Sequence, residues 1–548
     1  MRHGGQILIE QLKAFGAERA FCVPGESYLA ALDGLYESGI DTIICRQEGG
    51  AAMMAEAHGK MTGEPGLCFV TRGPGASNAA IGVHIAQQDS TPMILFVGQV
   101  ARGMQDREAF QEVNFQAMFG PLCKWAAEIR QTERIPEYVA RAWHTALSGR
   151  PGPVVLSLPE DMLSARAEAE IVPKCPTPVA HPGEEDLQAV HDALAGAKRP
   201  LMIIGGPLWS KEAGEQVAAF AERLALPVVA TFRYQDYMDN RHPNYVGNMG
   251  IGIDPNLARR IQEADWLLVM GPRLGEMTTG GYSLVKAPVP DQHLIHIHPC
   301  AEELGRVYRT DVPVQASLRA FAARLADIPT PNNLPWAEAT AQARKEYEAF
   351  SQPQETPGAV KMEQVVSYVN ATLPENGIVT NGAGNYSAWV HRYFTYKGYR
   401  SQISNTAGAM GYGIPAAVAG KLAAPDAPIV CFAGDGCFLM NGQEIATAMQ
   451  YGLKLIILVV NNGMYGTIRM HQEREYPDRV SGTTLVNPDF ADYARSFGAH
   501  GVVVEKGEDF PAAFDAALKA DKTTLIELRV DPQAITPKAT LDQIRGSG

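Results

Sequence analysis

The chain has 548 residues and carries 47 Lys and Arg against 60 Asp and Glu, a net charge of −13. At one domain per ~100–200 residues, this length predicts about three domains and excludes a small binding module. Because the charge is negative and no Lys/Arg-rich run occurs, nucleic acid and anionic membrane surfaces are poor partners.

The apolar runs and the cysteines indicate the compartment. Met93–Val97 and Leu455–Val460 are typical apolar runs, far below the ~18 residues that span a bilayer. The first residues lead straight into an amphipathic segment without the features of a secretory signal. The eight cysteines form no C-x-x-C pair. We therefore expect no membrane partner, a cytoplasmic location and reduced, mostly buried thiols.

Short β-type apolar runs alternate with longer helical patterns along the whole chain, which is typical of parallel sheets covered by helices on both faces. Proline-rich stretches at 171–186, 328–335 and 351–358 are typical of linkers. The predicted fold class is α/β, with three doubly wound domains at 1–170, 187–327 and 358–535.

The first and last thirds share a strand–glycine–helix plan. Leu67–Val70 precedes Thr-Arg-Gly-Pro-Gly, and Ile429–Phe432 precedes Ala-Gly-Asp-Gly. This pattern indicates two copies of one ancestral domain, although any two doubly wound domains contain such units. The middle third has predicted strands at 201–204, 266–270 and 294–298, and we expect a Rossmann-like sheet.

Three histidines, His293, His296 and His298, lie close together in the last of these strands. The last two would share a face of the strand, as metal ligands can. No Cys, Asp or Glu accompanies them and Pro299 ends the segment, so we interpret them as ordinary strand residues.

The strongest chemical signal is Gly434-Asp435-Gly436, followed 27 residues after Asp435 by Asn462 at the end of the strand 455–460. A strand–helix–strand crossover would place both side chains at the carboxyl ends of neighbouring parallel strands. With the Met464 carbonyl they offer three hard oxygens to Mg²⁺, which completes its shell with phosphate and water. Gly434 and Gly436 would let backbone N–H groups approach a diphosphate. The alternative is a glycine-rich turn with a capping Asn pair.

This pattern resembles the signature of the thiamine-diphosphate-dependent enzymes, and the first third resembles their acetolactate synthase-like branch. The matching motifs are Val23-Pro24-Gly25, Arg46-Gln47-Glu48, Met54–Ala57, Thr71–Asn78, Asp89–Pro92, Phe110–Val113 and Ser148–Pro153. The resemblance implies pyrimidine-binding, central and diphosphate-binding domains, and a homo-oligomer, a dimer or a dimer of dimers, with each site shared between subunits.

The resemblance also implies roles for single residues. Glu48 would exchange a proton with the pyrimidine ring of the cofactor, and Met410 would support its bent conformation; core packing is the alternative for Met410. Gln111 would help orient the second substrate; a surface or interface role is the alternative for it and for Lys124. The remaining residues implied to bind the cofactor are Gly25, Asn385, Gly434, Asp435, Gly436, Cys437, Asn462, Met464 and Tyr465.

Several positions differ from the synthase pattern. Gln47 stands where the family has His, Glu26-Ser27 follow Gly25 and would place polar groups near the entrance, and His471 replaces a Trp that favours larger acceptors. The flavin-binding stretch reads Arg273–Met277, so we do not expect a requirement for FAD.

The first hypothesis is an enzyme that uses thiamine diphosphate and Mg²⁺ to decarboxylate a small 2-oxo acid and to join the product to a carbonyl acceptor. The alternative is a 2-oxo acid decarboxylase resembling benzoylformate decarboxylase, favoured by Asn462–Gly466, N-G-M-Y-G. A binding-only relative would have no need of Glu48 together with Asp435 and Asn462.

Overall fold

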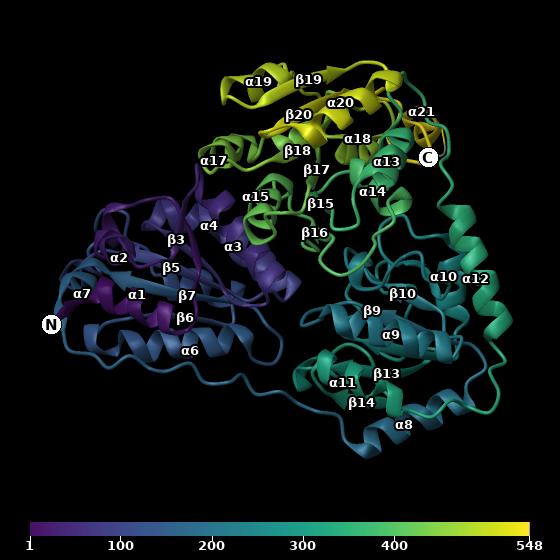
Figure 1. Ribbon diagram of the computed structural model, residues 1–548, viewed down its shortest axis with the longest axis horizontal. Coiled ribbons are helices and arrows are strands. Elements are labelled where there is room, and N and C mark those ends of the chain that lie inside the picture. Colours follow the sequence, from purple (N-terminus) through teal and green to yellow (C-terminus); the bar gives the residue numbers. More distant parts are fainter. Residues whose placement is uncertain (547–548) are drawn as a thin grey trace.

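The computed structural model describes residues 1–546 as three α/β domains, each built on a six-stranded sheet whose paired strands all run parallel (Figure 1). The first sheet has the order β3 (Asp41–Ile44), β2 (Arg19–Cys22), β4 (Gly66–Val70), β5 (Met93–Gln99), β7 (Pro153–Pro159) and β6 (Trp125–Glu128). The middle sheet has the order β11 (Tyr245–Asn248), β10 (Val228–Ala230), β9 (Pro200–Ile204), β12 (Trp266–Met270), β13 (His293–His298) and β14 (Val312–Gln315). The third has the order β16 (Gln402–Ser404), β15 (Ile378–Asn381), β17 (Ile429–Gly434), β18 (Leu455–Asn461), β20 (Thr524–Arg529) and β19 (His500–Val504). The predicted fold class is confirmed.

Helices cover the sheets. The first domain has α1 (Gly4–Ala14), α2 (Leu29–Leu35), α3 (Glu48–Thr62), α4 (Gly73–Asp89), α5 (Phe115–Phe119), α6 (Ile135–Leu147) and α7 (Glu160–Ser164). The middle domain has α8 (Glu184–Gly196), α9 (Lys211–Arg223), α10 (Pro255–Glu263) and α11 (Leu318–Arg324), and α12 (Ala337–Phe350) leads to the next domain. The third domain has α13 (Met362–Thr372), α14 (Tyr386–Tyr393), α15 (Gly413–Ala423), α16 (Asp435–Phe438), α17 (Ile445–Gln450), α18 (Gly466–Glu475), α19 (Phe490–Ser496), α20 (Phe510–Lys519) and α21 (Leu541–Arg545).

The first and third sheets have the same topology. With the strands of each sheet numbered from its first strand, both read 2-1-3-4-6-5, whereas the middle sheet reads 3-2-1-4-5-6, the Rossmann order. The predicted relation between the first and last thirds is therefore seen in strand order, which is a stronger observation than shared strand–glycine–helix units. A short antiparallel pair, β1 (Arg2–His3) with β8 (Arg166–Ala167), closes the first domain.

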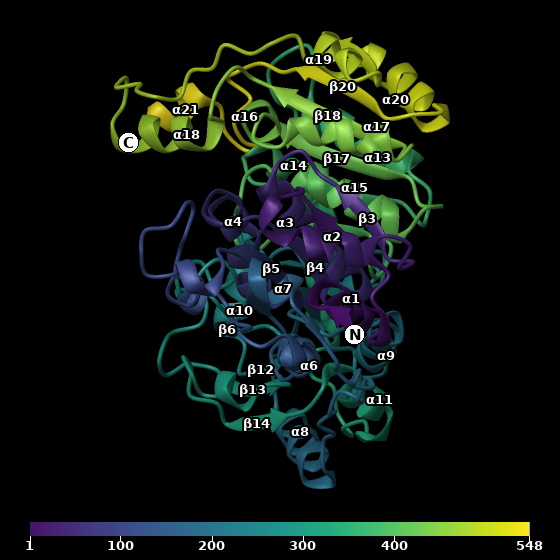
Figure 2. The ribbon, with the colours of Figure 1, turned by 90° about the vertical axis from the view of Figure 1, so that its left-hand side faces the viewer.

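The first and third domains share one hydrophobic core. Helix α3 of the first domain packs against α4 of its own domain and against α15 of the third, and the buried side chains of the three helices form a single cluster with residues of both sheets. Every residue from Gly49 to Gly59 in α3 is buried, as expected of a helix that is small and apolar all round. Figure 2 shows the two domains in direct contact through this layer.

A group of buried ionised side chains joins the same two domains. Lys60 Nζ lies 2.5 Å from Asp89 Oδ2 and 3.3 Å from Glu56 Oε1, and it donates to the Ser404 carbonyl at 2.7 Å. Glu56 accepts from Thr91 and from Tyr412, while Asp89 Oδ1 accepts from the Thr406 backbone and hydroxyl. The segment 404–412, which contains Met410, is thus held against the first domain.

The connections between domains lie where the prolines predict them. No helix or strand occurs at 168–183, and α8 begins at Glu184. In Figure 1 this segment runs from the first domain to the middle one, and α12 runs back to the third. The polar segment 351–361 then leads to α13.

The middle-strand histidines make backbone hydrogen bonds. His296 Nε2 lies 3.0 Å from the Pro272 carbonyl, and His298 Nδ1 accepts from the Cys300 N–H. Burial lowers the pKa of both side chains to about 4, so they are neutral near pH 7. Nothing in residues 1–546 gathers three His, Cys, Asp or Glu side chains as a metal site.

Six of the eight cysteines are buried and all are free thiols; Cys175 is exposed and Cys300 partly so. Across residues 1–546 we find no helix with the length and hydropathy needed to cross a membrane.

We predict that Lys60→Gln destabilises the protein by about 3–5 kcal/mol, because it leaves two buried carboxylates without their cation. Equilibrium urea unfolding at fixed protein concentration measures this. Lys174→Gln is the matched control, since Lys174 pairs with Glu64 at the surface, and its loss should change stability by ~0–1 kcal/mol. Equal effects of the two substitutions would contradict the prediction.

Candidate functional site

The residues singled out by the sequence lie at the carboxyl ends of the strands in the first and third sheets. In an order of 2-1-3-4, ligands bind at the carboxyl ends of strands 1 and 3, where the order reverses. In the third domain these strands are β15 and β17, which precede Asn385 and Asp435. In the first domain they are β2 and β4, which precede Gly25 and Gly73.

Asp435 is buried, with 2% of its surface exposed, at the start of the four-residue helix α16. Its Oδ1 accepts from the Gly436 N–H at 3.0 Å, and its Oδ2 from the Gly463 N–H at 2.9 Å and from Asn487 Nδ2 at 2.7 Å. Burial raises the pKa of the carboxyl, while these donors oppose the shift. The crossover thus joins Asp435 directly to the turn that carries Asn462.

A second layer of amides holds this arrangement. Asn487 Nδ2 also donates to Asn461 Oδ1 at 3.0 Å, and Asn461 donates to Glu527 on β20 at 2.8 Å. Asn487 Oδ1 is buried and has no hydrogen-bond partner among residues 1–546. Asn487 could not be found from the sequence, because it lies 52 residues from Asp435 in a segment that carries no recognisable motif.

Aromatic rings explain both glycines of the motif. A Cβ on Gly434 would lie 3.0 Å from the Tyr386 ring, and one on Gly436 would lie 2.5 Å from the Tyr465 ring. Cys437 is buried, and its Sγ accepts from the Gly411 N–H at 3.2 Å. Cys437 therefore connects the Gly-Asp-Gly turn to the neighbour of Met410, and Met410 packs on the core of the third domain.

Asn385 is engaged with the C-terminal part of the domain. Thr467 Oγ1 accepts from the Asn385 backbone N–H at 3.0 Å and donates to Asn385 Oδ1 at 2.9 Å. Asn385 Nδ2 donates to the Ile535 carbonyl at 3.0 Å. The same Nδ2 lies 3.4 Å from Met470 Sδ, so both amide N–H groups point to neighbours within the chain, and the expected contact with a phosphate stays a prediction. Figure 2 shows α18 and α21 side by side at this end of the domain.

Glu48 begins α3, directly after β3. Its Oε2 accepts from Asn78 Nδ2 at 2.9 Å, and Gly75 leaves room beside Oε1, since a Cβ there would lie 3.4 Å away. Ala51, Ala52 and Met53 are buried behind it, but the Glu48 side chain itself is only partly buried. The closed apolar surroundings expected for this carboxyl are not completed by one chain.

Glu444 of the third domain fixes the start of α3. Its Oε1 accepts from the backbone N–H groups of Arg46 at 3.0 Å and Gln47 at 3.1 Å, and its Oε2 accepts from Thr447 at 2.5 Å. Burial raises the pKa of Glu444, and the hydrogen bonds oppose the shift. No motif or periodicity in the sequence predicts this interdomain contact.

Gln111, Gly25 and Ser27 lie in the first domain. Gln111 has φ +66°, and its carbonyl accepts from the Gly73 N–H at 3.0 Å; its side chain makes no hydrogen bond within residues 1–546. A Cβ on Gly25 would lie 2.5 Å from the Thr71 side chain. The Ser27 hydroxyl is buried against Thr71 at 3.0 Å and is not open to an entrance, whereas Glu26 is exposed.

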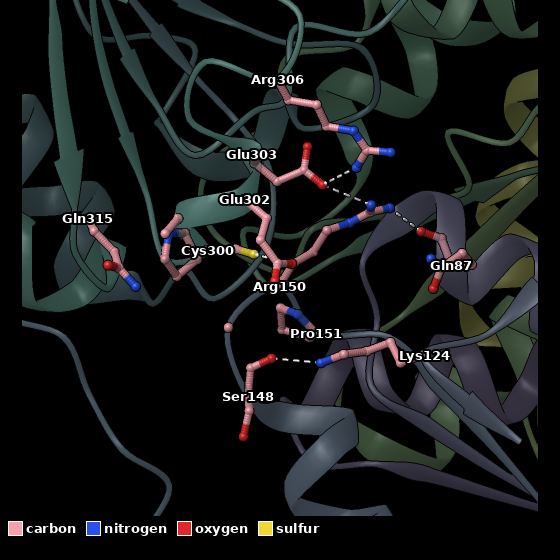
Figure 3. A pocket seen from close by; sticks show the side chains of 13 residues that line it. Gln87, Lys124, Ser148, Arg150, Pro151, Cys300, Glu302, Glu303, Arg306 and Gln315 are labelled. Atoms are coloured by element: carbon pink, nitrogen blue, oxygen red, sulfur yellow. Dashed lines mark hydrogen bonds and ion pairs between the residues drawn. The ribbon is translucent and has the colours of Figure 1, made fainter. Parts of the chain in front are cut away.

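Lys124 and His471 lie outside this group of contacts. Lys124 lines a polar cavity of about 490 Å³ between the first and middle domains (Figure 3). Its Nζ donates to the Ser148 carbonyl at 2.7 Å, and Arg150 and Arg306 both pair with Glu303. Burial lowers the pKa of Lys124 to about 8. His471 is exposed on α18 and lies 3.4 Å from Arg474.

Comparison with known proteins agrees with this geometry. Family models of the thiamine pyrophosphate enzymes match residues 2–118 (N-terminal TPP binding domain), 187–325 (central domain) and 382–528 (C-terminal TPP binding domain). The acetolactate synthase isozyme 2 large subunit of Escherichia coli (strain K12) is 30% identical over 534 residues, 96% of each chain. The chain belongs to the thiamine pyrophosphate enzyme family.

Other relatives in this family are acetolactate synthase-like as well. The acetolactate synthase large subunit of Parasynechococcus marenigrum (strain WH8102) is 32% identical over 547 residues, covering 96% of this chain and 87% of the relative. The probable acetolactate synthase large subunit of Methanocaldococcus jannaschii is 30% identical over 553 residues, covering 97% and 93%. The cofactor is thiamine diphosphate, with Mg²⁺ as its usual partner ion.

The donor set around Asp435 fits that cofactor. One buried carboxylate, one amide and the backbone of the same turn supply hard oxygens, and the buried Asn487 Oδ1 beside them has no protein partner. An unpartnered buried acceptor is costly unless an ion, a water or another donor completes it. The site is thus built for a cation that this chain's side chains do not replace.

Proposed function

We propose that this protein uses thiamine diphosphate and Mg²⁺ to decarboxylate a small, pyruvate-like 2-oxo acid and to ligate the product to a carbonyl acceptor, as an acetolactate synthase-like enzyme. The observation that carries the proposal is the pairing of sites in two sheets of the same topology. Glu48 follows strand 2 of the first sheet, and the Asp435 set follows strands 3 and 4 of the third.

In this proposal residues 358–535 bind the diphosphate. Asp435, Asn462 and the Met464 carbonyl hold Mg²⁺, and the backbone N–H groups around Gly434, Gly436 and Cys437 approach the phosphates. Tyr465 covers this turn through its ring contact with Gly436, and Met410 lies on the segment tied to Cys437. The Asn385 side-chain amide donates to the diphosphate only after it releases the Ile535 carbonyl.

Residues 1–170 supply the acid–base group, while residues 187–327 form the central domain. The bound cofactor supplies an electron sink for the bond to the leaving carboxylate. Glu48 holds or passes a proton at Oε1, which no side chain occupies, while Asn78 orients Oε2. Gln111, whose side-chain amide is free, orients the second substrate, and Gly25 lets the loop after β2 approach the cofactor.

The site is proposed to be shared between subunits of a homodimer or a dimer of dimers in the cytoplasm, without FAD. The partial exposure of Glu48 supports this, because a general acid–base carboxyl works best in a closed site. A simple 2-oxo acid decarboxylase is the alternative, supported by the N-G-M-Y-G sequence of Asn462–Gly466 and by His471 in place of Trp.

Incubation with pyruvate and quantification of both products tests the reaction. We expect acetolactate to exceed free acetaldehyde, because the acceptor is held beside the reacting carbon before the product leaves. Acetaldehyde as the dominant product would favour the decarboxylase alternative. Absence of turnover with any short 2-oxo acid, in enzyme that binds the cofactor, would contradict both.

We predict that Asp435→Ala purifies without thiamine diphosphate, since the ion that bridges protein and diphosphate loses its carboxylate. Calorimetric titration of the cofactor with Mg²⁺ present measures the affinity. Asp489→Ala is the control, because that carboxylate caps α19 at the surface. Cofactor binding to Asp435→Ala with wild-type affinity would refute the metal assignment.

Glu48→Gln should retain cofactor binding while exchange of the cofactor's C2 proton slows by ~10²–10⁴-fold, because an amide cannot cycle a proton. Proton–deuteron exchange followed by NMR after acid quenching measures the rate.

Co-expression of Glu48→Gln chains with Asp435→Ala chains tests the shared site. Hybrid dimers contain one intact site, so random pairing should restore about a quarter of wild-type activity. If the hybrids stay inactive, the two groups act within one chain.

A further inference from the structure

A cavity of about 210 Å³ lies where the middle and third domains meet, and Asn385, one of the residues assigned to the diphosphate, is at its edge among the lining residues. Its walls come from the loop between β11 and α10, from α12, from α14 and from residues 536–538. Most of the lining is apolar; Ile253, Leu257, Tyr347, Phe350 and Met470 contribute to it. Ile251 also lines the cavity and is 55% exposed.

Arg392 lines this cavity as a buried cation without an anion. Arg392 is only 8% exposed, and its guanidinium carbon lies 4.2 Å from the centre of the Phe350 ring. Nε donates to the Phe350 carbonyl at 2.9 Å, Nη1 has no partner, and no ion pair with Arg392 occurs in the described part of the chain. Buried charges are normally paired through direct hydrogen bonds; Asp254 is close enough to act on the charge of this guanidinium but forms no ion pair with it.

Arg233 provides the comparison within the same chain. It is 5% exposed, and its two Nη atoms donate to the carbonyls of Asn405 and Gly382. Arg233 thus ties the middle domain to the third, although its Nε has no hydrogen-bond partner among residues 1–546. Arg392 differs from it in lining an open cavity.

Lys538 adds a second positive charge to the same wall. Its Nζ lies 4.9 Å from the centre of the Phe350 ring, and it makes no ion pair with residues 1–546. Burial and the nearby Arg392 lower its pKa. Asp254 is the carboxylate among the lining residues, and its Oδ1 caps α10 by accepting from the Asn256 N–H at 3.0 Å. Two cations face one engaged carboxylate, so the cavity is net positive.

We propose that this cavity binds a small organic carboxylate with a compact apolar body. A guanidinium binds a carboxylate through paired, charge-assisted hydrogen bonds, and the apolar walls favour a hydrocarbon body over a phosphate. The volume is below the ~300–1,000 Å³ of drug-sized ligand sites, so the ligand is small. The inference stands apart from the proposed reaction, since Arg392, Lys538 and Phe350 are not assigned to the cofactor.

Calorimetric titration of the cofactor-loaded enzyme with 3-methylbutanoate tests this site, because that acid lacks the 2-oxo group and cannot react. We expect saturable binding to wild type that weakens by about tenfold or more in Arg392→Gln and in Lys538→Gln. Lys211→Gln is the control, because Lys211 is 76% exposed on α9 and remote from the cavity. The Lys538 variant keeps the test valid if Arg392→Gln folds poorly.

Two further ligands sharpen the outcome. The neutral isostere 3-methylbutanamide should bind weakly, and inorganic phosphate should bind less tightly than the acid. Equal affinity for acid and amide, tighter binding of phosphate, or unchanged binding in both variants would overturn the proposal. Pyruvate turnover measured in the presence of 3-methylbutanoate identifies the source of the carboxylate. A raised KM for pyruvate assigns the cavity to substrate binding, whereas a change in kcat alone assigns it to a separate effector.

Discussion

The packing of α3 against α15 is the constraint on which the rest of the structure depends. It merges the cores of the first and third domains. The Lys60–Glu56–Asp89 group within it prevents the two domains from sliding past each other, because each carboxylate accepts hydrogen bonds from both domains. Such a buried network stabilises only in one geometry. It therefore fixes the segment 404–412, and with it Met410, relative to the helix that begins at Glu48.

The repeated topology then distributes the chemistry. Glu48 and Met410 both follow strand 2 of their sheets, while the Arg72-Gly73 and Gly-Asp-Gly turns both follow strand 3. One copy carries a carboxyl suited to proton transfer, and the other carries a carboxylate placed among amides and backbone N–H groups. The two sheets thus carry different side chains at equivalent strand ends on the same backbone topology.

The strands, the linkers and the meeting of Asp435 with the Asn462 turn could be predicted, because they follow from periodicity, proline and the handedness of a crossover. The roles of Asn487 and Glu444 could not, since each acts through one contact with a residue far away in sequence. The expectation for Ser27 differs from the structure for the same reason: a motif shows which loop a side chain is on, and packing decides where it points. Arg392 and Lys538 could not be linked from the sequence, because what they share is contact with the Phe350 ring and the lack of an ion pair, and both are features of the folded chain.

Buried polar groups with a full set of partners hold this fold together, whereas buried polar groups that lack a partner mark the places proposed to bind ligands. In the Lys60 group, the Glu56 and Asp89 carboxylates have donors at both oxygens. Around Asp435, by contrast, Asn487 Oδ1 accepts no hydrogen bond from residues 1–546. Arg392 likewise forms no ion pair with these residues. Leaving a buried polar group unpaired costs ~1–3 kcal/mol, and more for a charged one. A cation bound beside Asn487 and a carboxylate bound to Arg392 would each remove that cost. The free energy lost by leaving these groups unpaired in the free chain would then contribute to ligand affinity.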